Sequence, residues 1–234
     1  MVVLGIDTAT PDAVVGVSAD GEALRGVQVP PGADGRPTHG QVLLPEIDRS
    51  VQAAGGWDRI DRIAVGIGPG SFTGLRIGVS TARALAQARE LPIAPVGSLR
   101  ALARGIGRQH GDGRVALPMI DARRGEAFAA LYDGENELWE PLVAPPPELA
   151  TRLQELDRPC LAAGDGALRF AAELEAAGAT VAPPEDPVHH LAARDVCAAG
   201  EAAPEAPPDQ IQPLYLRPPD AKRWLERDRS DPGG

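Results

Sequence analysis

Cysteine is nearly absent from the sequence, since only Cys160 and Cys197 occur and they lie far apart without Cys-x-x-Cys spacing. Two isolated cysteines provide neither a disulfide framework nor a zinc site, so we predict a reducing compartment, the cytoplasm. No apolar run reaches the roughly 20 residues that a membrane helix needs. Residues 2–6 are apolar but meet Asp7 at once and lack a basic flank, unlike a signal peptide. We therefore expect no membrane association.

Basic residues are too few for a surface that binds nucleic acid alone. The chain has 23 Lys and Arg against 33 Asp and Glu, which gives a net charge of −10 at pH 7. Contacts with phosphates dominate nucleic-acid affinity, so proteins that bind RNA by themselves usually have a basic face. If an RNA is involved, we expect another subunit to hold most of it.

Motifs of hydrolases and zinc enzymes are also missing. The four histidines form neither His-Glu-x-x-His nor a pair spaced for a helical zinc site, and Ser71 does not lie in a Gly-x-Ser-x-Gly elbow. The adjacent His189 and His190, and the pair Arg123 and Arg124, are more typical of surface positions than of ligands. We predict no catalytic residue and no metal ligand in this chain.

The elements that are present predict an α/β protein. Apolar runs separated by turn residues predict an opening of three antiparallel strands over 2–6, 13–18 and 23–29. A Rossmann domain would instead place a helix after the first strand. Further strands are expected at 60–67, 92–96, 115–120, 126–132, 160–163, 179–182 and 211–217. Helices are expected at 39–54, 75–89, 98–107, 167–177 and 188–199.

The two halves of this pattern resemble each other weakly, which suggests duplicated α/β halves that face a cleft. We predict an N-terminal lobe over 1–108, completed by a return of 211–225, a second lobe over 109–210, and a flexible tail over 226–234. Pro45 lies inside the first expected helix, which must either start late or bend there.

The glycine-rich loop Gly68-Pro-Gly-Ser-Phe-Thr-Gly74 precedes a helix, and helix N-termini favour anions. The loop lacks the lysine of a P-loop and the spacing of a dinucleotide fingerprint, so a tight strand-to-helix turn is an equally simple interpretation. An Asx turn would likewise explain Asp7. An ordinary turn would explain Gly164. The candidate nucleotide-binding residues are Asp7, Thr8, Gly68, Gly70, Ser71 and Gly164.

A stripe of small residues runs along the helix after this loop, at Gly74, Gly78, Ala82 and Ala86. Such a stripe allows close packing, either against a partner helix or against the protein's own sheet. The exposed share of the stripe distinguishes the two interpretations.

Five segments together resemble the TsaB (YeaZ) family. They cover most of residues 1–132, and residues 212–217 add a weaker match, whereas residues 133–210 match poorly. The segments are IDTAT at 6–10, HGQVLLPEID at 39–48, AVGIGPGSFTGLRIGVSTARALA at 64–86, PVGSL at 95–99 and MIDARRGEAFAALY at 119–132.

The resemblance implies an actin/Hsp70-like (ASKHA, ribonuclease H-like) duplicated fold and a non-catalytic subunit. Members pair with the catalytic subunit TsaD, and the ATPase TsaE joins the pair, to transfer a threonylcarbamoyl group to the adenosine beside the anticodon of tRNA. Members also form homodimers through helices that match 39–54 and 75–88. We therefore predict an interface of Leu43, Ile47, Gly74, Gly78, Ala82 and Ala86.

Two alternatives remain open. The first is a stand-alone ATP-binding enzyme of the actin and sugar-kinase class, and the second is a glycoprotease-type metallopeptidase, which the missing zinc motif disfavours. The sequence requires no cofactor, but ATP or ADP with Mg²⁺ at the cleft or at the partner interface is compatible with the resemblance.

Overall fold

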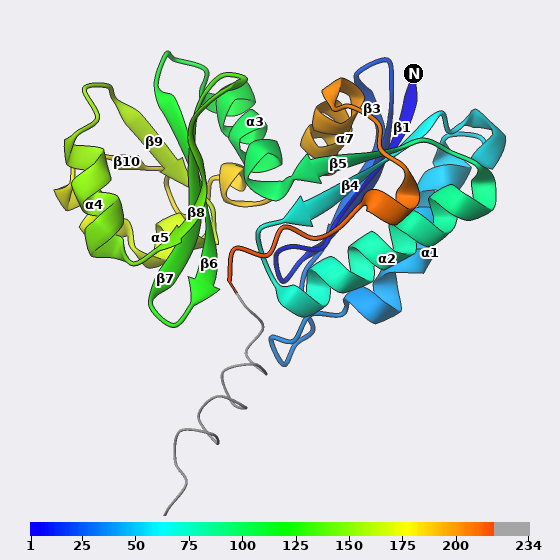
Figure 1. Ribbon diagram of the computed structural model, residues 1–234, viewed down its shortest axis with the longest axis horizontal. Helices are drawn as coiled ribbons and strands as arrows, with labels where there is room; N and C mark the ends of the chain where they lie inside the picture. Colours follow the sequence, from blue (N-terminus) through cyan, green and yellow to red (C-terminus); the bar gives the residue numbers. More distant parts are fainter. Residues whose placement is uncertain (218–234) are drawn as a thin grey trace, which may run out of the picture.

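Two five-stranded sheets share one strand pattern (Figure 1). The structure is a computed structural model and describes residues 1–217. The strand order is β3-β2-β1-β4-β5 in the first sheet and β10-β9-β6-β7-β8 in the second. In each sheet three consecutive strands pair antiparallel, and two later strands add in parallel beside the first of them. The predicted two-lobe α/β architecture is therefore confirmed.

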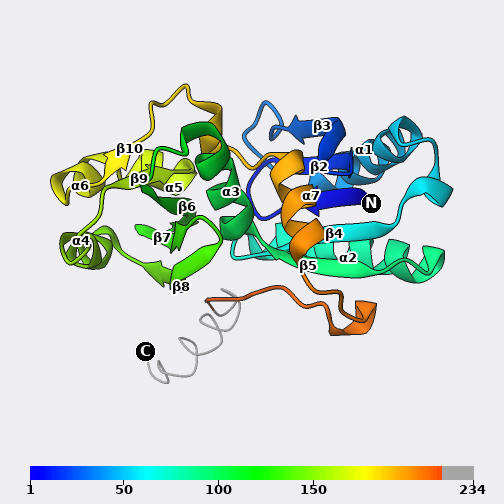
Figure 2. The ribbon, with the colours of Figure 1, turned by 90° about the horizontal axis from the view of Figure 1, so that it is seen from above.

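The first lobe is built on the sheet of β1 to β5. Its strands are β1 (Val2–Asp7), β2 (Ala13–Ala19), β3 (Glu22–Val29), β4 (Arg62–Gly68) and β5 (Ile93–Gly97). Its helices are α1 (His39–Ala53), α2 (Phe72–Arg89) and α7 (Ala193–Ala202), with 3₁₀ turns η1 (Trp57–Arg59) and η3 (Pro208–Gln210). Helices α1 and α2 cover one face of the sheet and α7 covers the other (Figure 2).

The second lobe is built on the sheet of β6 to β10. Its strands are β6 (Val115–Arg123), β7 (Glu126–Asp133), β8 (Asn136–Ala144), β9 (Cys160–Ala163) and β10 (Thr180–Val181). Its helices are α3 (Ser98–His110), α4 (Pro146–Gln154), α5 (Asp165–Arg169) and α6 (Ala171–Ala176), with the 3₁₀ turn η2 (Pro187–His189). Helix α3 covers one face of this sheet, and α4 to α6 cover the other.

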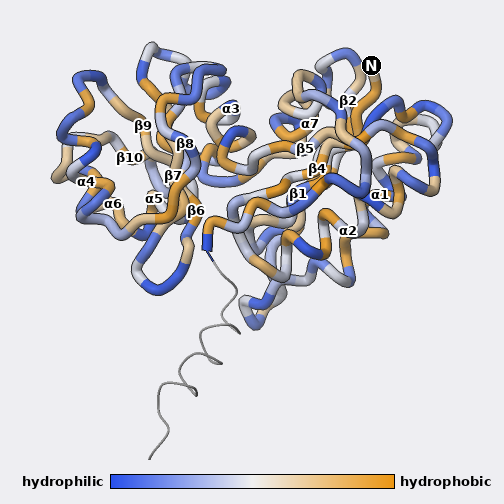
Figure 3. Tube along the Cα trace, viewed as in Figure 1, coloured by the Kyte–Doolittle hydropathy of each residue, from blue (hydrophilic) through white to orange (hydrophobic). Residues whose placement is uncertain are grey.

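Strand β1 shows why its sequence is almost continuously apolar. Val3 packs with α7 on one face, whereas Leu4 and Ile6 pack with α1 and α2 on the other. Successive side chains of a strand point to opposite faces, so a central strand covered on both sides needs apolar residues at every position. Figure 3 shows the same hydrophobic character along the inner strands, with hydrophilic turns at the ends.

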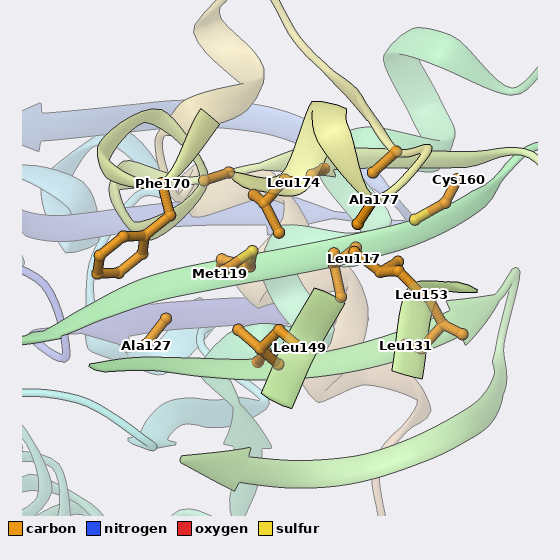
Figure 4. Packing of buried hydrophobic residues seen from close by; sticks show 14 of the residues in the cluster. Leu117, Met119, Ala127, Leu131, Leu149, Leu153, Cys160, Phe170, Leu174 and Ala177 are labelled. Carbon is orange, nitrogen blue, oxygen red and sulfur yellow. The ribbon is translucent and has the colours of Figure 1, made fainter. Parts of the chain in front are cut away.

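The core of the second lobe lies between its sheet and α4 to α6 (Figure 4). Leu117 and Met119 of β6 meet Leu149 of α4 and Leu174 of α6 there, and all four side chains are fully buried. Leu149 and Leu174 lie in residues 133–210, which matched the family poorly in sequence, yet they complete this core.

Helices α3 and α7 lie side by side where the two lobes meet (Figures 1 and 2). Helix α3 follows β5 directly but packs on β6, whereas α7 returns from the second lobe to pack on β1, β2 and β4. The predicted second lobe over 109–210 differs from this arrangement, because α7 contributes its apolar side chains to the core of the first lobe.

Some predicted elements were wrong in detail. Residues 211–217 form no strand. A backbone hydrogen bond, from the Leu214 amide to the Ile67 carbonyl, joins this segment to β4. The helix expected over 188–199 begins at Ala193, and the one expected over 167–177 is divided into α5 and α6. Helix α1 does not start late, since it runs through Pro45. The predicted return of 218–225 and the tail 226–234 lie outside the described residues.

Candidate functional site

The turn after β1 holds the glycine-rich loop in place. The carboxylate of Asp7 accepts hydrogen bonds from the Ala9 amide at 2.7 Å and from the Ser98 hydroxyl at 2.7 Å. The same Ser98 oxygen accepts a hydrogen bond from the Gly68 amide at 3.2 Å. Asp7 therefore acts through Ser98 on the start of the loop.

Two further bonds complete this brace. The hydroxyl of Thr8 donates to the carbonyl of Gly74 at 2.8 Å, and the amide of Ser71 donates to the carbonyl of Ala9 at 2.7 Å. The hydroxyl of Ser71 caps α2 by accepting from the Gly74 amide at 3.3 Å, which is why α2 begins at Phe72 and not at residue 75. The loop is thus fixed at both ends by residues 7–9.

Burial dominates the chemistry of Asp7. Its side chain lies against Gly66, where an added Cβ would come within 1.9 Å of the carboxylate. Burial raises the pKa of Asp7 from 3.8 to about 6, although the hydrogen bonds from Ala9 and Ser98 oppose the rise. Since Asp7 is only 1% exposed and both oxygens are bonded within the protein, it cannot reach a ligand in the cleft without rearrangement.

A cleft of about 450 Å³ lies between the two lobes. From the first lobe it is lined by the glycine-rich loop, including Gly70 and Ser71, and from the second by the ends of β6 and α5. Phe72 and Phe128 add apolar walls. The cleft is therefore bounded by the N-terminal end of α2 on one side and by acidic and basic side chains on the other.

Two carboxylates, Asp121 and Asp165, line the second-lobe wall of this cleft. Asp121 accepts from the amide of Arg123 at 2.8 Å and from the guanidinium of Arg169 at 2.8 Å, while Asp165 accepts from the amide of Asp121 at 2.9 Å. Burial is the main cause that raises the pKa of Asp165. Within residues 1–217, no three histidine, cysteine or acidic side chains come together to hold a metal ion.

Residues 211–217, which we call the strap, cross the mouth of the cleft from one lobe to the other. The Leu214 amide donates to the Ile67 carbonyl at 2.7 Å, and the ring of Tyr215 packs on Phe72 with centroids 4.9 Å apart. At its other end, the guanidinium of Arg217 donates to Glu126 at 2.7 Å and to the carbonyl of Ala122 at 2.6 Å. The strap therefore joins the lobes non-covalently beside the cleft.

The predicted nucleotide-binding residues separate into two groups. Gly70 and Ser71 line the cleft, whereas Asp7 and Thr8 lie beneath it and brace the loop. Gly68 is packed beside Leu75, and an added Cβ at Gly164 would lie 1.9 Å from the carbonyl of Met119. Nucleotide binding stays a prediction for Gly70 and Ser71, and the cleft residues that the sequence did not reveal are Asp121, Asp165, Tyr215 and Arg217.

The predicted interface residues do not form an exposed surface. The stripe along α2 packs on the turn after β1, and added Cβ atoms at Gly74 and Gly78 would lie 2.1 and 2.2 Å from oxygens of Thr8. The stripe serves close packing within the chain, and pairing through these residues stays a prediction. All six predicted residues are buried: Leu43, Ile47, Gly74, Gly78, Ala82 and Ala86.

Comparison with known proteins agrees with this geometry. A family model described as TsaD, tRNA N6-adenosine threonylcarbamoyltransferase, matches residues 28–203. The tRNA threonylcarbamoyladenosine biosynthesis protein TsaB of Escherichia coli is 36% identical over 172 residues, which is 71% of this chain and 72% of the relative. The chain belongs to the TsaB (YeaZ) family.

Solved structures support this assignment. A Pseudomonas aeruginosa protein described as similar to the peptidase YeaZ has a TM-score of 0.75 and 27% identity, with 92% of this chain and 99% of that chain covered. A ROK hexokinase from Thermus thermophilus has a TM-score of 0.52 and 14% identity, over 86% of this chain and 99% of that chain, and shows the fold alone. The actin-like fold that the sequence predicted for the family is thereby confirmed. No helix among residues 1–217 is long and apolar enough to cross a membrane.

Proposed function

We propose that the chain is a non-catalytic subunit of the tRNA threonylcarbamoyl transferase complex. In this proposal it pairs with the catalytic relative TsaD and with the ATPase TsaE, and the assembly modifies the adenosine beside the anticodon. Membership of the TsaB family supports the pathway, because the E. coli relative is named for tRNA threonylcarbamoyladenosine biosynthesis.

The state of Asp7 carries the non-catalytic part of the proposal. An acid that holds a metal–nucleotide complex needs an oxygen that faces the ligand, but both oxygens of Asp7 are bonded inside the protein. Its energetic role is to fix the loop through Ser98, which is a structural role. A subunit in which this acid is bonded to Ala9 and Ser98 of its own chain is suited to pair with a catalytic partner rather than to perform the transfer.

Reconstitution tests this directly. Purified chain is mixed with TsaD, TsaE, ATP, threonylcarbamoyl donor and tRNA, complex formation is followed by gel filtration, and modified adenosine is measured by mass spectrometry. We expect modification to require this chain, and the variant Asp7→Asn to form the complex and to retain about half or more of the activity. An intact Asp7→Asn complex that has lost modification would show that Asp7 takes part in chemistry.

A second candidate function is ATP binding by the isolated chain, as in a stand-alone enzyme of the actin and sugar-kinase class. The observation that favours it is the position of Gly70 and Ser71, which bring the N-terminus of α2 to the cleft. Helix N-termini favour phosphate groups. Calorimetry with Mg-ATP on the isolated chain distinguishes the cases: binding with turnover supports the enzyme, whereas binding without turnover is compatible with a subunit that holds nucleotide at its cleft or partner interface.

The third function, a glycoprotease-type metallopeptidase, has the name of the P. aeruginosa neighbour in its favour. Metal analysis of the purified chain, together with a peptidase assay, tests it. Stoichiometric zinc or iron with peptidase activity would replace our proposal.

We further propose that pairing, including homodimerisation in isolation, uses the outward faces of α1 and α2. Leu44 on α1 is 60% exposed, whereas the small-residue stripe is buried. We place the chain in the cytoplasm, which agrees with its two buried free cysteines. Burial raises the pKa of Cys197 to about 11, so its thiol stays protonated and unreactive at neutral pH.

A further inference from the structure

A second groove, of about 350 Å³, lies between α3 and α7 where the lobes meet. Figure 2 shows these helices side by side. Gly21 of the β2–β3 turn and Gly134 of the β7–β8 turn also line the groove. None of its lining residues lines the inter-lobe cleft described above. Three arginines stand in its wall: Arg104, Arg108 and Arg194.

Arg108 is held in a fixed orientation. Its Nε and one terminal nitrogen donate to the two oxygens of Asp195 at 3.0 and 2.8 Å, and Asp195 is itself buried. A two-point bond of this kind locks the planar guanidinium, while its other terminal nitrogen makes no hydrogen bond within residues 1–217.

The other two arginines have unused donors. Arg104 contacts the exposed Glu135 at 2.9 Å, but its Nε is buried and has no acceptor in the described part of the chain. Arg194 is exposed on the first turn of α7 and has no acidic partner among residues 1–217. The exposed guanidinium of Arg194 therefore has donors available for an incoming oxyanion.

The charge of the groove contrasts with that of the molecule. Three guanidinium groups face two carboxylates, those of Glu135 and Asp195, in a chain whose net charge is −10. Small side chains keep the groove accessible: an added Cβ at Gly107 or Gly134 would meet no atom within 4 Å.

A comparison with Arg62 shows that unused arginine donors do not by themselves make a site. Arg62 also has a buried Nε without an acceptor among the described residues, but its terminal nitrogens are used up on carbonyls at the end of α7 and on Glu205. It lines none of the grooves named here. At α3 and α7, by contrast, free donors, positive charge and open space coincide.

We propose that the α3–α7 groove binds a phosphate group, with Arg194 and Arg108 as its principal donors. The guanidinium geometry matches the oxygens of phosphate. This phosphate group belongs either to a free phosphate compound or to the backbone of tRNA. The tRNA alternative rests on the proposed function.

The first experiment uses the isolated full-length chain and inorganic phosphate as the probe. Backbone amide NMR shifts of α3 and α7 are followed during the titration, in wild type, in Arg194→Gln and in the control Arg36→Gln, whose side chain is 86% exposed in a surface loop. We expect saturable shifts in wild type and control, and affinity about tenfold weaker in Arg194→Gln, because a charge-assisted hydrogen bond to the anion is lost. No saturable shift at α3 and α7, or equal affinity in Arg194→Gln, would overturn the proposal.

The second experiment distinguishes the sources. The chain paired with TsaD is titrated with tRNA at several salt concentrations by fluorescence anisotropy. A weaker affinity for Arg194→Gln, with a salt slope smaller by about 1, assigns the site to the tRNA backbone. An unchanged affinity together with the phosphate shifts assigns it to a free phosphate compound. If wild type fails to pair with TsaD, the proposed function fails, but the NMR titration still decides the groove.

Discussion

The buried carboxyl group of Asp7 orients the glycine-rich loop through Ser98. Its folded-state pKa of about 6 lies above its ordinary value of 3.8, so the folded protein binds this proton more tightly than the unfolded chain. Stability from this group is therefore present at low pH and is lost as the pH rises from about 4 to about 6. The difference amounts to roughly 3 kcal/mol.

The variant Asp7→Asn removes this titration while keeping an oxygen that can accept from Ala9. We expect the free energy of unfolding of wild type, relative to the variant, to fall by roughly 3 kcal/mol between about pH 4 and pH 7. Urea unfolding at several pH values measures this difference, in which the titrations of all other groups cancel. A difference that does not change with pH would show that the carboxyl is not buried as described.

Gly78 tests the close packing of α2 on the turn after β1. A Cβ there would come within 2.2 Å of the Thr8 hydroxyl oxygen, which also donates to Gly74. Gly78→Ala should therefore destabilise the protein by about 1–3 kcal/mol through overpacking. Thermal or urea unfolding measures it. The matched control is Gly40→Ala on α1, where an added Cβ meets nothing within 4 Å and a gain of roughly 0.5–1 kcal/mol is expected. Equal effects at both positions would contradict the packing.

At the scale of elements, the strap over 211–217 is the segment whose removal should loosen the lobes. Arg217→Met removes the donors to Glu126 and to the Ala122 carbonyl. We expect the Leu214 amide, which bonds to Ile67, to exchange its hydrogen about tenfold faster, because about 1.5–3 kcal/mol of charge-assisted bonding is lost. Arg36→Met, at an exposed ion pair with Asp34, should leave this exchange unchanged.

Elements with a strong local pattern were predictable from the sequence, and elements fixed by distant contacts were not. Strand β8 was not predicted, but the other strands of both sheets lie within about three residues of their predicted ranges, since each is an apolar run bounded by turn residues. The strap was predicted as a strand because it is rich in apolar residues, Ile211, Leu214, Tyr215 and Leu216, yet the structure assigns it no strand pairing. Likewise, nothing local to α7 reveals that this helix, which follows the second lobe in the sequence, packs on β1 of the first lobe.

The candidate site was predictable only in part for the same reason. Gly70 and Ser71 were found because a glycine-rich loop before a helix is a local signal. The pairing of Asp121 with Arg169, and of Tyr215 with Phe72, joins segments far apart in the chain. The stripe of small residues was visible, but its partner was not: a period of four residues indicates close packing without saying whether the neighbour is another subunit or Thr8.

For the whole molecule, the negative charge is concentrated in the second lobe. Residues 133–186 of the second lobe hold 12 acidic and three arginine side chains, which accounts for nearly all of the net charge of −10. An RNA backbone is repelled by such a surface. RNA contacts of the assembly should therefore avoid the outer part of the second lobe, and the first lobe is left as the side for partners.

The surface for pairing is best tested on the exposed face of α1. Leu44 is 60% exposed there, and Leu24 on β3 is a matched control that is 49% exposed on a different element. Leu44→Asp should weaken pairing with TsaD or with a second copy by about 2 kcal/mol or more, since burial of a leucine is lost and a charge must be desolvated. This corresponds to more than about tenfold in Kd, measured by analytical ultracentrifugation. Leu24→Asp should pair as wild type does. Equal weakening by both changes would point to a general effect of added charge, and weakening by Leu24→Asp alone would move the interface to β3.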